Sequence, residues 1–338
     1  MASGEEGKGE TVLVTGASGF IGSTLVRGLL GRGYNVRAGV LDPDDRAETD
    51  HLLALAAGAG RLSFFRCDLL DGAALLDAAR GCSGVFHLAS PCTVDPVKDP
   101  QNQLMVPAVE GTLNVVRAAK DAGGVRRVVV TSSISAVVPN PGWPAGEVVD
   151  ERCWTDIDYC EKNGVWYPAS KTLAEKAAWK FAEENGLDVV VVNPGTVLGP
   201  MIPPAINASM AMFCRLLQGC TEEYADFFLG PVHVEDVAMA HILVFESASA
   251  SGRHLCVHSI CHWSDFAAKV AELYPDYKVP KDIVLCCFTC RFPMDTQPGL
   301  VRQEVGSKKL TALGLQITPM EKIIRDAVES LKSRGHIS

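Results

Sequence analysis

The stretch TVLVTGASGFIG, residues 11–22, decides the fold. Its first five residues form a short apolar run, which is typical of a strand buried on both faces of a sheet. Three glycines follow at a spacing of three: the first permits a tight turn, the second lets the backbone approach a pyrophosphate, and the third allows a helix to pack closely on the strand. A helix N-terminus after the turn favours negative charge. The stretch therefore predicts a dinucleotide-binding turn made by Gly16, Ser18, Gly19, Phe20, Ile21 and Gly22.

Outward from this turn, strand-like and helix-like segments alternate up to residue 193. The expected strands are 11–15, 34–40, 62–67, 85–88, 127–132 and 187–192, and the expected helices are 21–32, 50–57, 73–79, 103–122 and 167–185. Such alternation predicts βαβ units with right-handed crossovers. The fold class is therefore α/β, a doubly wound parallel (Rossmann) sheet with helices on both faces.

The alternation of strand-like and helix-like segments ends after Asn193, where prolines cluster. Beyond it we expect helices at 205–217, 234–247 and 319–332 together with shorter elements, and too few strands for an independent sheet domain. We therefore divide the chain into a nucleotide-binding domain, residues 1–195, and a smaller substrate-binding lid, residues 196–338. Returns of the chain to the first domain are expected near residues 230–260.

The composition of the 338-residue chain narrows the function classes. It is 47% hydrophobic and 21% charged, which excludes extended disorder. The net charge of −9 argues against nucleic acid as a partner. Apolar runs are too short to span a bilayer, and the first ten residues are polar, so we expect a cytoplasmic protein that does not bind membranes. The sequence assigns no oligomeric state.

The twelve cysteines are interpreted mainly as reduced thiols. Cys286, Cys287 and Cys290 form a CCxxC cluster without a second ligand pair, and the histidines lack zinc-ligand spacing, so no metal site is predicted. Cys153 and Cys160 lie seven residues apart, and whether they form a redox-sensitive bridge stays open.

Two further motifs contain candidate catalytic residues. In YPASK, Tyr167 and Lys171 are four residues apart and share one face of the expected helix. The ammonium favours ionisation of the phenol and can hold a ribose hydroxyl, so the tyrosine can give a proton to a carbonyl oxygen. The run TSS, residues 131–133, ends the fifth strand, at the edge where such sheets present ligand-binding groups. A serine there can hydrogen-bond a substrate carbonyl, whereas Ser132 is expected to cap local backbone.

With these motifs in place, the chain resembles the extended short-chain dehydrogenases/reductases, and within them the plant cinnamoyl-CoA reductase and dihydroflavonol reductase group. The resemblance spans about residues 10–331 and rests on VTGASGFIGSTLVRGLL, RCDLLD, VFHLAS, VVVTSSISAV, ERCWTDIDY, YPASKTLAEKAAW, VVNPGTVLGP, NAS and HVEDVAMAHILVFE. It implies hydride transfer to an aromatic, phenylpropanoid-type carbonyl compound, as in lignin biosynthesis.

The resemblance also implies the roles of individual residues. Ser133, Tyr167 and Lys171 are the implied catalytic set. The implied cofactor contacts outside the glycine turn are Asp68, Leu69, Leu88, Ala89, Ser90, Pro194, Gly195, Thr196, Val197 and Ser209. The implied substrate contacts are Ser133, Trp166, Met212, Arg215 and Arg253.

The chain departs from the group after the second strand. Leu41 replaces the arginine that pairs with the 2′-phosphate of NADP, and Ala47 replaces a lysine. Asp42 can instead accept a hydrogen bond from a free ribose hydroxyl, as in NAD-preferring enzymes. Arg37 and Arg46 are the remaining candidates for the phosphate. NADP is the expected cofactor, and NAD stays possible because of Leu41.

Other departures concern the substrate. The group's NWYCYGK signature is VWYPASK here, residues 165–171. The histidine and lysine linked to coenzyme A are Met212 and Arg215, and Arg253 matches the third member of that set. A methionine is a poor hydrogen-bonding partner for a thioester or a phosphate. The small-molecule carbonyl substrate is therefore a thioester, an aldehyde or a ketone.

Alternatives remain open at this stage. A dihydroflavonol or hydroxysteroid-type dehydrogenase and a sugar-nucleotide epimerase use the same kind of scaffold. A regulatory protein that binds nucleotide without turnover belongs to another class, and the intact Ser133, Tyr167 and Lys171 set argues against it.

Overall fold

The computed structural model of the protein describes residues 9–56, 60–91, 98–144, 147–219, 228–279, 302–304 and 306–338. Within these ranges, seven parallel strands form one sheet in the order β10-β6-β5-β4-β1-β2-β3. The strands are β1 (Thr11–Thr15), β2 (Asn35–Val40), β3 (Leu62–Arg66), β4 (Gly84–His87), β5 (Arg127–Thr131), β6 (Val189–Pro194) and β10 (Gly252–Cys256). The expected doubly wound parallel sheet is confirmed.

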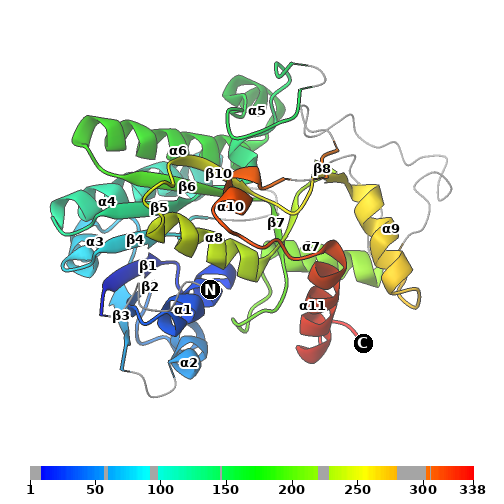
Figure 1. Cartoon of the computed structure of the whole chain (residues 1–338), viewed down its shortest axis with the longest axis horizontal. Coiled ribbons are helices and arrows are strands. Elements are labelled where there is room, and N and C mark those ends of the chain that lie inside the picture. The colour runs from blue at the N-terminus through cyan, green and yellow to red at the C-terminus, as the bar shows by residue number, and fades with distance from the viewer. Residues whose placement is uncertain are drawn as a thin grey trace.

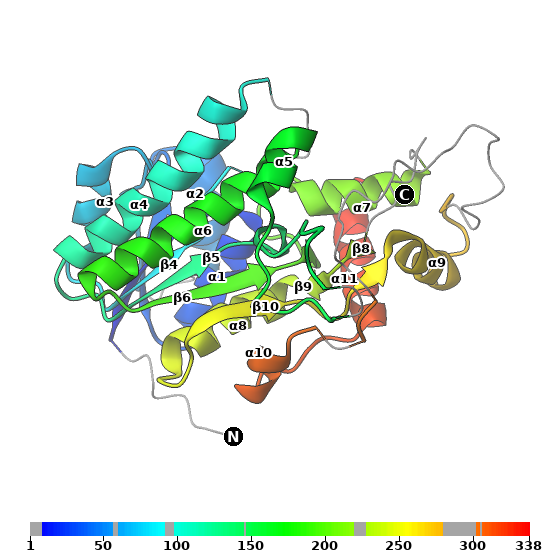
Figure 2. The ribbon, with the colours of Figure 1, turned by 90° about the horizontal axis from the view of Figure 1, so that it is seen from above.

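Helices cover both faces of this sheet (Figures 1 and 2). One face carries α3 (Gly72–Ala79), α4 (Val106–Asp121) and α6 (Trp166–Asn185), whose apolar residues share a core with the valines of β5 and β6. The other face carries α1 (Phe20–Gly31), α2 (Arg46–Leu55) and α8 (Val234–Glu246), which pack in the larger core. The central strands are apolar on both sides because both faces are covered.

The register of the strands places the ligand-binding edge. Thr15, the last residue of β1, pairs with Gly39 on β2 and His87 on β4, and Thr131 of β5 pairs with Val192 of β6. These strands therefore end at one edge. In open α/β sheets, ligands bind outside the carboxyl ends of the strands.

The remaining elements gather mainly beyond this edge (Figure 1). They are η1 (Gln101–Met105), η2 (Ile134–Ala136), α5 (Ile157–Asn163), β7 (Thr196–Leu198), α7 (Ala208–Gln218), β8 (Phe228–Leu229), β9 (Pro231–His233), β11 (Cys261–His262), α9 (Trp263–Leu273), α10 (Lys308–Ala312) and α11 (Met320–Ser333). β7 pairs with β9 and β8 with β11. The chain also returns to the main sheet, because β10 pairs along β6.

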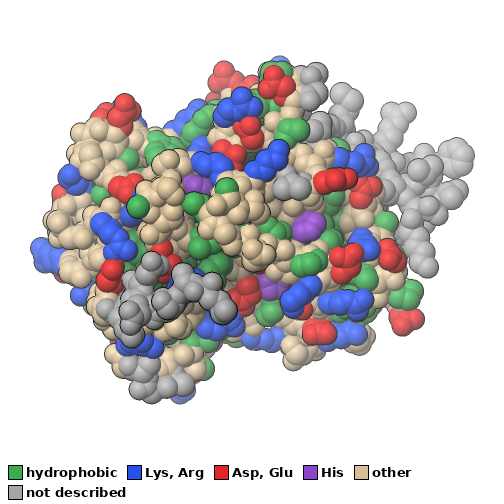
Figure 3. Space-filling model, in the orientation of Figure 1, with side chains coloured by type: hydrophobic (Ala, Val, Ile, Leu, Met, Phe, Trp, Pro, Cys, Tyr) green, Lys and Arg blue, Asp and Glu red, His purple; other side chains and the backbone are tan. Residues whose placement is uncertain are grey.

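Charges of both signs are mixed on the face of the molecule that Figure 3 shows. No helix among the described residues has the length and apolar character needed to cross a membrane.

Candidate active site

A cavity of about 550 Å³ lies at the carboxyl edge of the sheet. Its walls come from the β1–α1 turn, the ends of β4, β5 and β6, the start of α6, and the β7, β8 and α7 region. Among the predicted site residues, the walls contain Gly16, Gly19, Phe20, Ile21, Gly22, Leu88, Ser90, Ser133, Tyr167, Lys171, Pro194, Gly195, Thr196, Val197, Ser209 and Met212. Segments nearly 200 residues apart in sequence thus meet around one space.

The glycine turn fits a pyrophosphate. Gly16 has φ +66°, and a Cβ there would lie 2.9 Å from the amide nitrogen of Ala89. A Cβ on Gly22 would lie 2.1 Å from the carbonyl oxygen of Gly16, so the helix approaches the turn closely. Gly19 caps α1 without any side-chain hydrogen bond, and the first turn of α1 holds no acidic residue. The helix N-terminus is therefore open to a phosphate oxygen.

A buried polar chain fixes the end of β4 against this turn. Thr15 Oγ1 accepts from the amides of Leu88 and Ala89, both at 3.2 Å, and contacts His87 Nδ1 at 2.9 Å. The Nε2 of His87 lies 3.1 Å from Thr112 Oγ1. Burial lowers the pKa of His87 to about 3, and the charge of Lys171 adds to this effect. The ring is therefore neutral and structural.

Ser133 follows β5 and presents its hydroxyl at the cavity. It caps η2, and its Oγ accepts from the amide of Ser135 at 3.1 Å. A hydroxyl carries one donor and two acceptor positions. Because the amide uses an acceptor position, the O–H can be donated to a carbonyl oxygen.

Tyr167 and Lys171 lie one turn apart at the start of α6. The Lys171 Nζ is 5.7 Å from the centre of the Tyr167 ring. Lys171 is only 7% exposed and lines the cavity together with Leu88 and Ser90, which follow β4. An ammonium in such surroundings favours an ionised phenol and donates to hydroxyl groups.

The structure corrects the prediction for Arg37, because the guanidinium is directed away from the expected cofactor. Its Nη1 donates to the carbonyl oxygens of Ala78 and Arg80 at the end of α3, and the group lies 4.8 Å from the centre of the Phe65 ring. Arg37 sits in the middle of β2 and faces the α3 side of the sheet.

The loop after β2 is acidic. Leu41 is 62% exposed, and its amide donates to Glu48 Oε2 at 2.8 Å, with the amide of Asp42 at 3.5 Å from the same oxygen. The Asp42 carboxylate accepts from the amide of Asp44. Arg46 is paired with Asp50 on the outside of α2. The carboxylate of Glu48 therefore occupies the amides where an anion would otherwise dock.

Asp68 and Leu69 lie after β3 but outside the cavity walls. Asp68 Oδ1 accepts from the amide of Leu70 at 2.9 Å. Leu69 packs against Gly111 of α4, and its carbonyl oxygen accepts from Asn114. Their contact with an adenine stays a prediction. The cofactor contacts of Ser18 and Ala89 also stay predictions; the carbonyl oxygen of Ser18 lies 3.1 Å from His51 Nε2.

Some of the predicted substrate residues line the cavity in the structure and others do not. Met212 lines the cavity, whereas Arg215 is exposed on α7 and Trp166, which begins α6, is half-buried; neither belongs to the cavity walls. The prediction for Arg253 is corrected, because its guanidinium is buried in an ion pair with Glu175 at 2.6 Å. Ser209 donates to the carbonyl oxygen of Val197 at 2.5 Å, which fixes the start of α7.

Glu175 and Asn193 were not predicted from the sequence, yet both lie in the polar network beside Ser133. Glu175 is 1% exposed and accepts from Ser132 Oγ at 2.6 Å, so Ser132 bonds this carboxylate rather than capping local backbone. Asn193 Nδ2 donates to Glu175 and to the carbonyl oxygen of Ser133. One sequence feature could have identified Glu175. It lies one turn after Lys171 on the same helix, on the helix face that packs against the sheet, where a carboxylate needs buried partners.

Cys153 and Cys160 are free and buried, and burial raises the pKa of each thiol to about 11. The described residues contain no cluster of three or more His, Cys, Asp or Glu placed to hold a metal. Cys286, Cys287 and Cys290 lie outside the described residues. His233 caps α8 by accepting a hydrogen bond from the amide of Glu235.

The fold and the cavity define an NAD(P)H-dependent oxidoreductase with a Rossmann sheet. Residues 12–257 match the NAD dependent epimerase/dehydratase family, and the chain belongs to this family. It is 45% identical to cinnamoyl-CoA reductase CAD2 of Medicago truncatula over 328 residues, which cover 96% of this chain and 97% of the relative. The resemblance to the plant cinnamoyl-CoA reductase group is thereby confirmed.

Two solved structures share the whole architecture. Vestitone reductase from alfalfa (Medicago sativa L.) superposes with a TM-score of 0.79 at 30% identity, covering 97% of this chain and 99% of that one. Yeast methylglyoxal/isovaleraldehyde reductase Gre2, complexed with NADPH, gives a TM-score of 0.78 at 26% identity, with 97% and 100% covered. Both neighbours are reductases.

Proposed function

We propose that the protein is a reductase that uses NADPH to reduce a phenylpropanoid-type aromatic carbonyl compound. The observation that carries the proposal is the convergence of Ser133, Tyr167 and Lys171 on the cavity that the glycine turn also lines. The similarity to cinnamoyl-CoA reductases supports the substrate class. A cytoplasmic location stays a prediction.

The chain's own groups would polarise and protonate the carbonyl. A bound reduced nicotinamide supplies the hydride. The Ser133 hydroxyl donates to the carbonyl oxygen, and Tyr167 gives that oxygen its proton. The Lys171 ammonium favours the phenolate left on Tyr167 and holds a ribose hydroxyl. The donors are held in place by the fold, so they are effective because little reorganisation is needed.

The cavity walls favour an aromatic substrate without coenzyme A. Leu88, Ile134, Ile206, Met212 and Phe228 supply apolar surface. Three positions in this group are linked to coenzyme A. Here Met212 places a thioether in the cavity wall, Arg215 is outside the cavity walls, and Arg253 is buried in an ion pair with Glu175. We therefore rank an aldehyde or ketone ahead of a thioester.

NADPH is the proposed cofactor, with weak discrimination against NADH. The NADPH complex of the Gre2 neighbour supports the choice. The exposed Leu41 offers no charge to a 2′-phosphate, and Glu48 repels one. The residues of the glycine turn fit either dinucleotide, because both contain the same pyrophosphate.

The test is an absorbance assay with NADPH or NADH and a panel of cinnamaldehydes, cinnamoyl-CoA esters, flavanonols and simple aldehydes. Tyr167→Phe should abolish turnover and leave nucleotide binding intact. Tyr159→Phe, a nearby tyrosine on α5 outside the cavity walls, is the matched control and should keep full activity. Full turnover by Tyr167→Phe would contradict the mechanism. Nucleotide binding without turnover of any carbonyl by the wild type would instead indicate a non-catalytic protein.

A further inference from the structure

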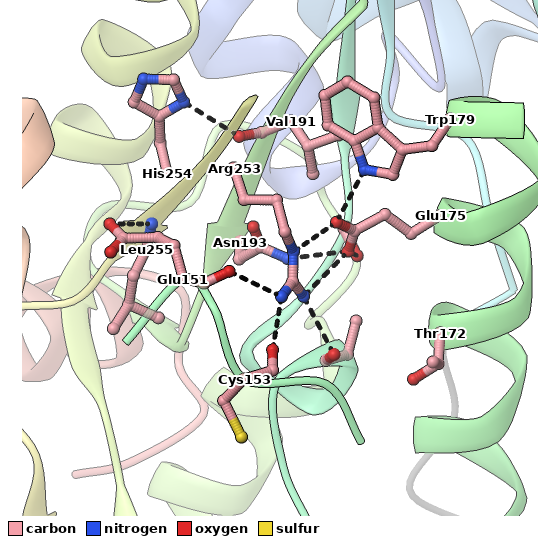
Figure 4. A network of polar contacts seen from close by, with 12 residues as sticks. Glu151, Cys153, Thr172, Glu175, Trp179, Val191, Asn193, Arg253, His254 and Leu255 are labelled. Carbon is pink, nitrogen blue, oxygen red and sulfur yellow. Dashed lines mark hydrogen bonds and ion pairs between the residues drawn. The ribbon is translucent and has the colours of Figure 1, made fainter. Parts of the chain in front are cut away.

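A buried ion pair lies behind the catalytic cavity. Arg253 of β10 and Glu175 of α6 are 7% and 1% exposed. Arg253 Nε donates to Glu175 Oε1 at 2.6 Å, and Nη2 lies 3.4 Å from Oε2. Figure 4 shows the guanidinium between Glu175 and the backbone around Cys153, with Asn193 beside the carboxylate. The two charges compensate each other where water is excluded.

Arg253 has no donor left for a ligand. Its remaining N–H groups donate to the carbonyl oxygens of Ala136, Glu151 and Cys153, so all five are used. Its guanidinium also stacks 3.8 Å from the centre of the Trp154 ring. A side chain with these partners binds protein rather than substrate.

Glu175 uses its acceptor capacity to orient groups beside the catalytic serine. Besides Arg253 and Trp179, it accepts from Ser132 Oγ at 2.6 Å and from Asn193 Nδ2 at 2.9 Å. Because Glu175 and the Ser133 carbonyl both accept, the Asn193 amide has to turn its Nδ2 toward them, at 3.2 Å from the Ser133 oxygen. The carboxylate therefore fixes the backbone of Ser133 from two sides.

The same carboxylate is attached to the helix that carries the proton donor. Glu175 follows Lys171 by one turn and Tyr167 by two turns on α6, so the three share one face. It joins this helix to the end of β5 through Ser132 and to β6 through Asn193. The link fixes how far Ser133 stands from Tyr167 and Lys171.

We infer that Glu175, held by Arg253, is a positioning residue that sets Ser133 against the Tyr167–Lys171 pair, and that Arg253 serves the reaction only in this way. The inference rests on the proposed carbonyl reduction. It predicts that the loss of Arg253 impairs every substrate equally, whether or not coenzyme A is attached.

The test compares Arg253→Met with a matched variant, Arg127→Met. Arg127 is also a buried arginine on the main sheet, bonding a carboxylate (Asp188) and the carbonyl oxygens of Val244, Ser247 and Ala250. It begins β5, whereas Ser133 follows the other end of that strand. Both variants remove a buried cation with similar partners, so both should lower Tm.

Only Arg253→Met should affect catalysis. We expect kcat to fall roughly 10- to 100-fold, as misplacement of a reacting group does. The loss should be the same for a cinnamaldehyde and for a cinnamoyl-CoA ester, with the Kd for NADPH unchanged within about twofold. Arg127→Met should keep kcat within about twofold. A loss confined to the KM for the thioester would mean that Arg253 contacts coenzyme A, and it would overturn the inference.

Two further variants keep the test decisive if Arg253→Met does not fold. Asn193→Ala leaves the ion pair intact but removes the direct hydrogen bond to the Ser133 carbonyl oxygen, one of the two links from Glu175, and it should lower kcat without changing the Kd for NADPH. Arg253→Lys keeps the charge and should retain a higher kcat than Arg253→Met. If Arg253→Met does not fold, the comparison is made with Asn193→Ala, and Arg253→Lys should again have the higher kcat. If the wild type reduces a carbonyl substrate and Asn193→Ala has the same kcat, the inference is overturned. A wild type without turnover would overturn the proposed function and the inference together.

Discussion

The amide nitrogen of Ala89 lies 2.9 Å from the position that a Cβ atom on Gly16 would occupy. The turn after β1 therefore lies so close to the chain after β4 that no side chain fits at position 16. Gly16 lines the cavity together with Leu88 and Ser90, which flank Ala89.

Gly16→Ala should weaken nucleotide binding strongly. The new methyl group would push the turn away from the residues after β4, and the Kd for NADPH should rise about tenfold or more. Gly60→Ala is the control, because Gly60 has a similar φ of +62° but open space around its Cβ. It should cost about 1 to 2 kcal/mol of stability without changing the Kd. Equal Kd values in the two variants, measured by fluorescence titration, would contradict the assignment of the turn.

Leu41→Arg should increase the preference for NADPH. An arginine at this exposed position can pair with a 2′-phosphate, so the ratio of kcat/KM for NADPH to that for NADH should rise about tenfold. Leu53→Arg places the same charge on α2, where the side chain is also exposed, and should leave the ratio unchanged. Steady-state kinetics with both nucleotides check this, and an unchanged ratio in Leu41→Arg would place the ribose elsewhere.

Met212→His should favour thioesters. It adds a hydrogen-bond donor to the cavity wall, so kcat/KM for a cinnamoyl-CoA ester should rise about threefold or more relative to that for the aldehyde. Arg215→His puts the same side chain on the exposed face of α7 and should not change the ratio. If both variants behave alike, the substrate does not lie against Met212.

Stability should fall at acid pH because of His241. This side chain is buried, with Nδ1 donating to the Val237 carbonyl oxygen at 2.7 Å and Nε2 lying 2.6 Å from Thr131 Oγ1. Burial lowers its pKa to about 4, below the value of about 6.5 in the unfolded chain. Between these values the unfolded chain binds more protons. The stability present above pH 6.5 is therefore lost as pH falls toward 4.

At pH 5 this linkage costs about 2 kcal/mol relative to pH 8. His241→Gln removes the titrating group, so the free energy of unfolding should fall less over this range by about that amount. Urea unfolding at both pH values measures the difference. An identical pH dependence in the variant and the wild type would show that His241 is protonated without cost.

Much of the nucleotide-binding half could be predicted from the sequence. The strands are short valine-rich runs and the helices are longer segments between them, so the expected elements agree with the structure to within a few residues. The glycine turn was predictable because its backbone conformation demands particular residues. The short elements α5, α9 and α10 were missed, because helices of 5 to 11 residues carry little pattern of their own.

Side-chain partners far apart in sequence could not be predicted. Glu175 and Arg253 are 78 residues apart, and the sequence around either residue does not indicate that the two form an ion pair. The family resemblance located Arg253 but not the direction of its guanidinium. Arg37 was misassigned for a related reason: its place within the second strand was clear, while the face of the sheet that it occupies depends on the strand's pleat.

The return of β10 to the main sheet has a consequence for synthesis of the chain. When residues up to Asn193 have left the ribosome, Glu175 still lacks its counter-charge and β6 has an open edge. Both are supplied only after residue 252 has emerged. A nascent or truncated chain would therefore hold an uncompensated carboxylate beside Ser132 and Asn193, so completion of the polar network behind Ser133 is tied to nearly complete translation.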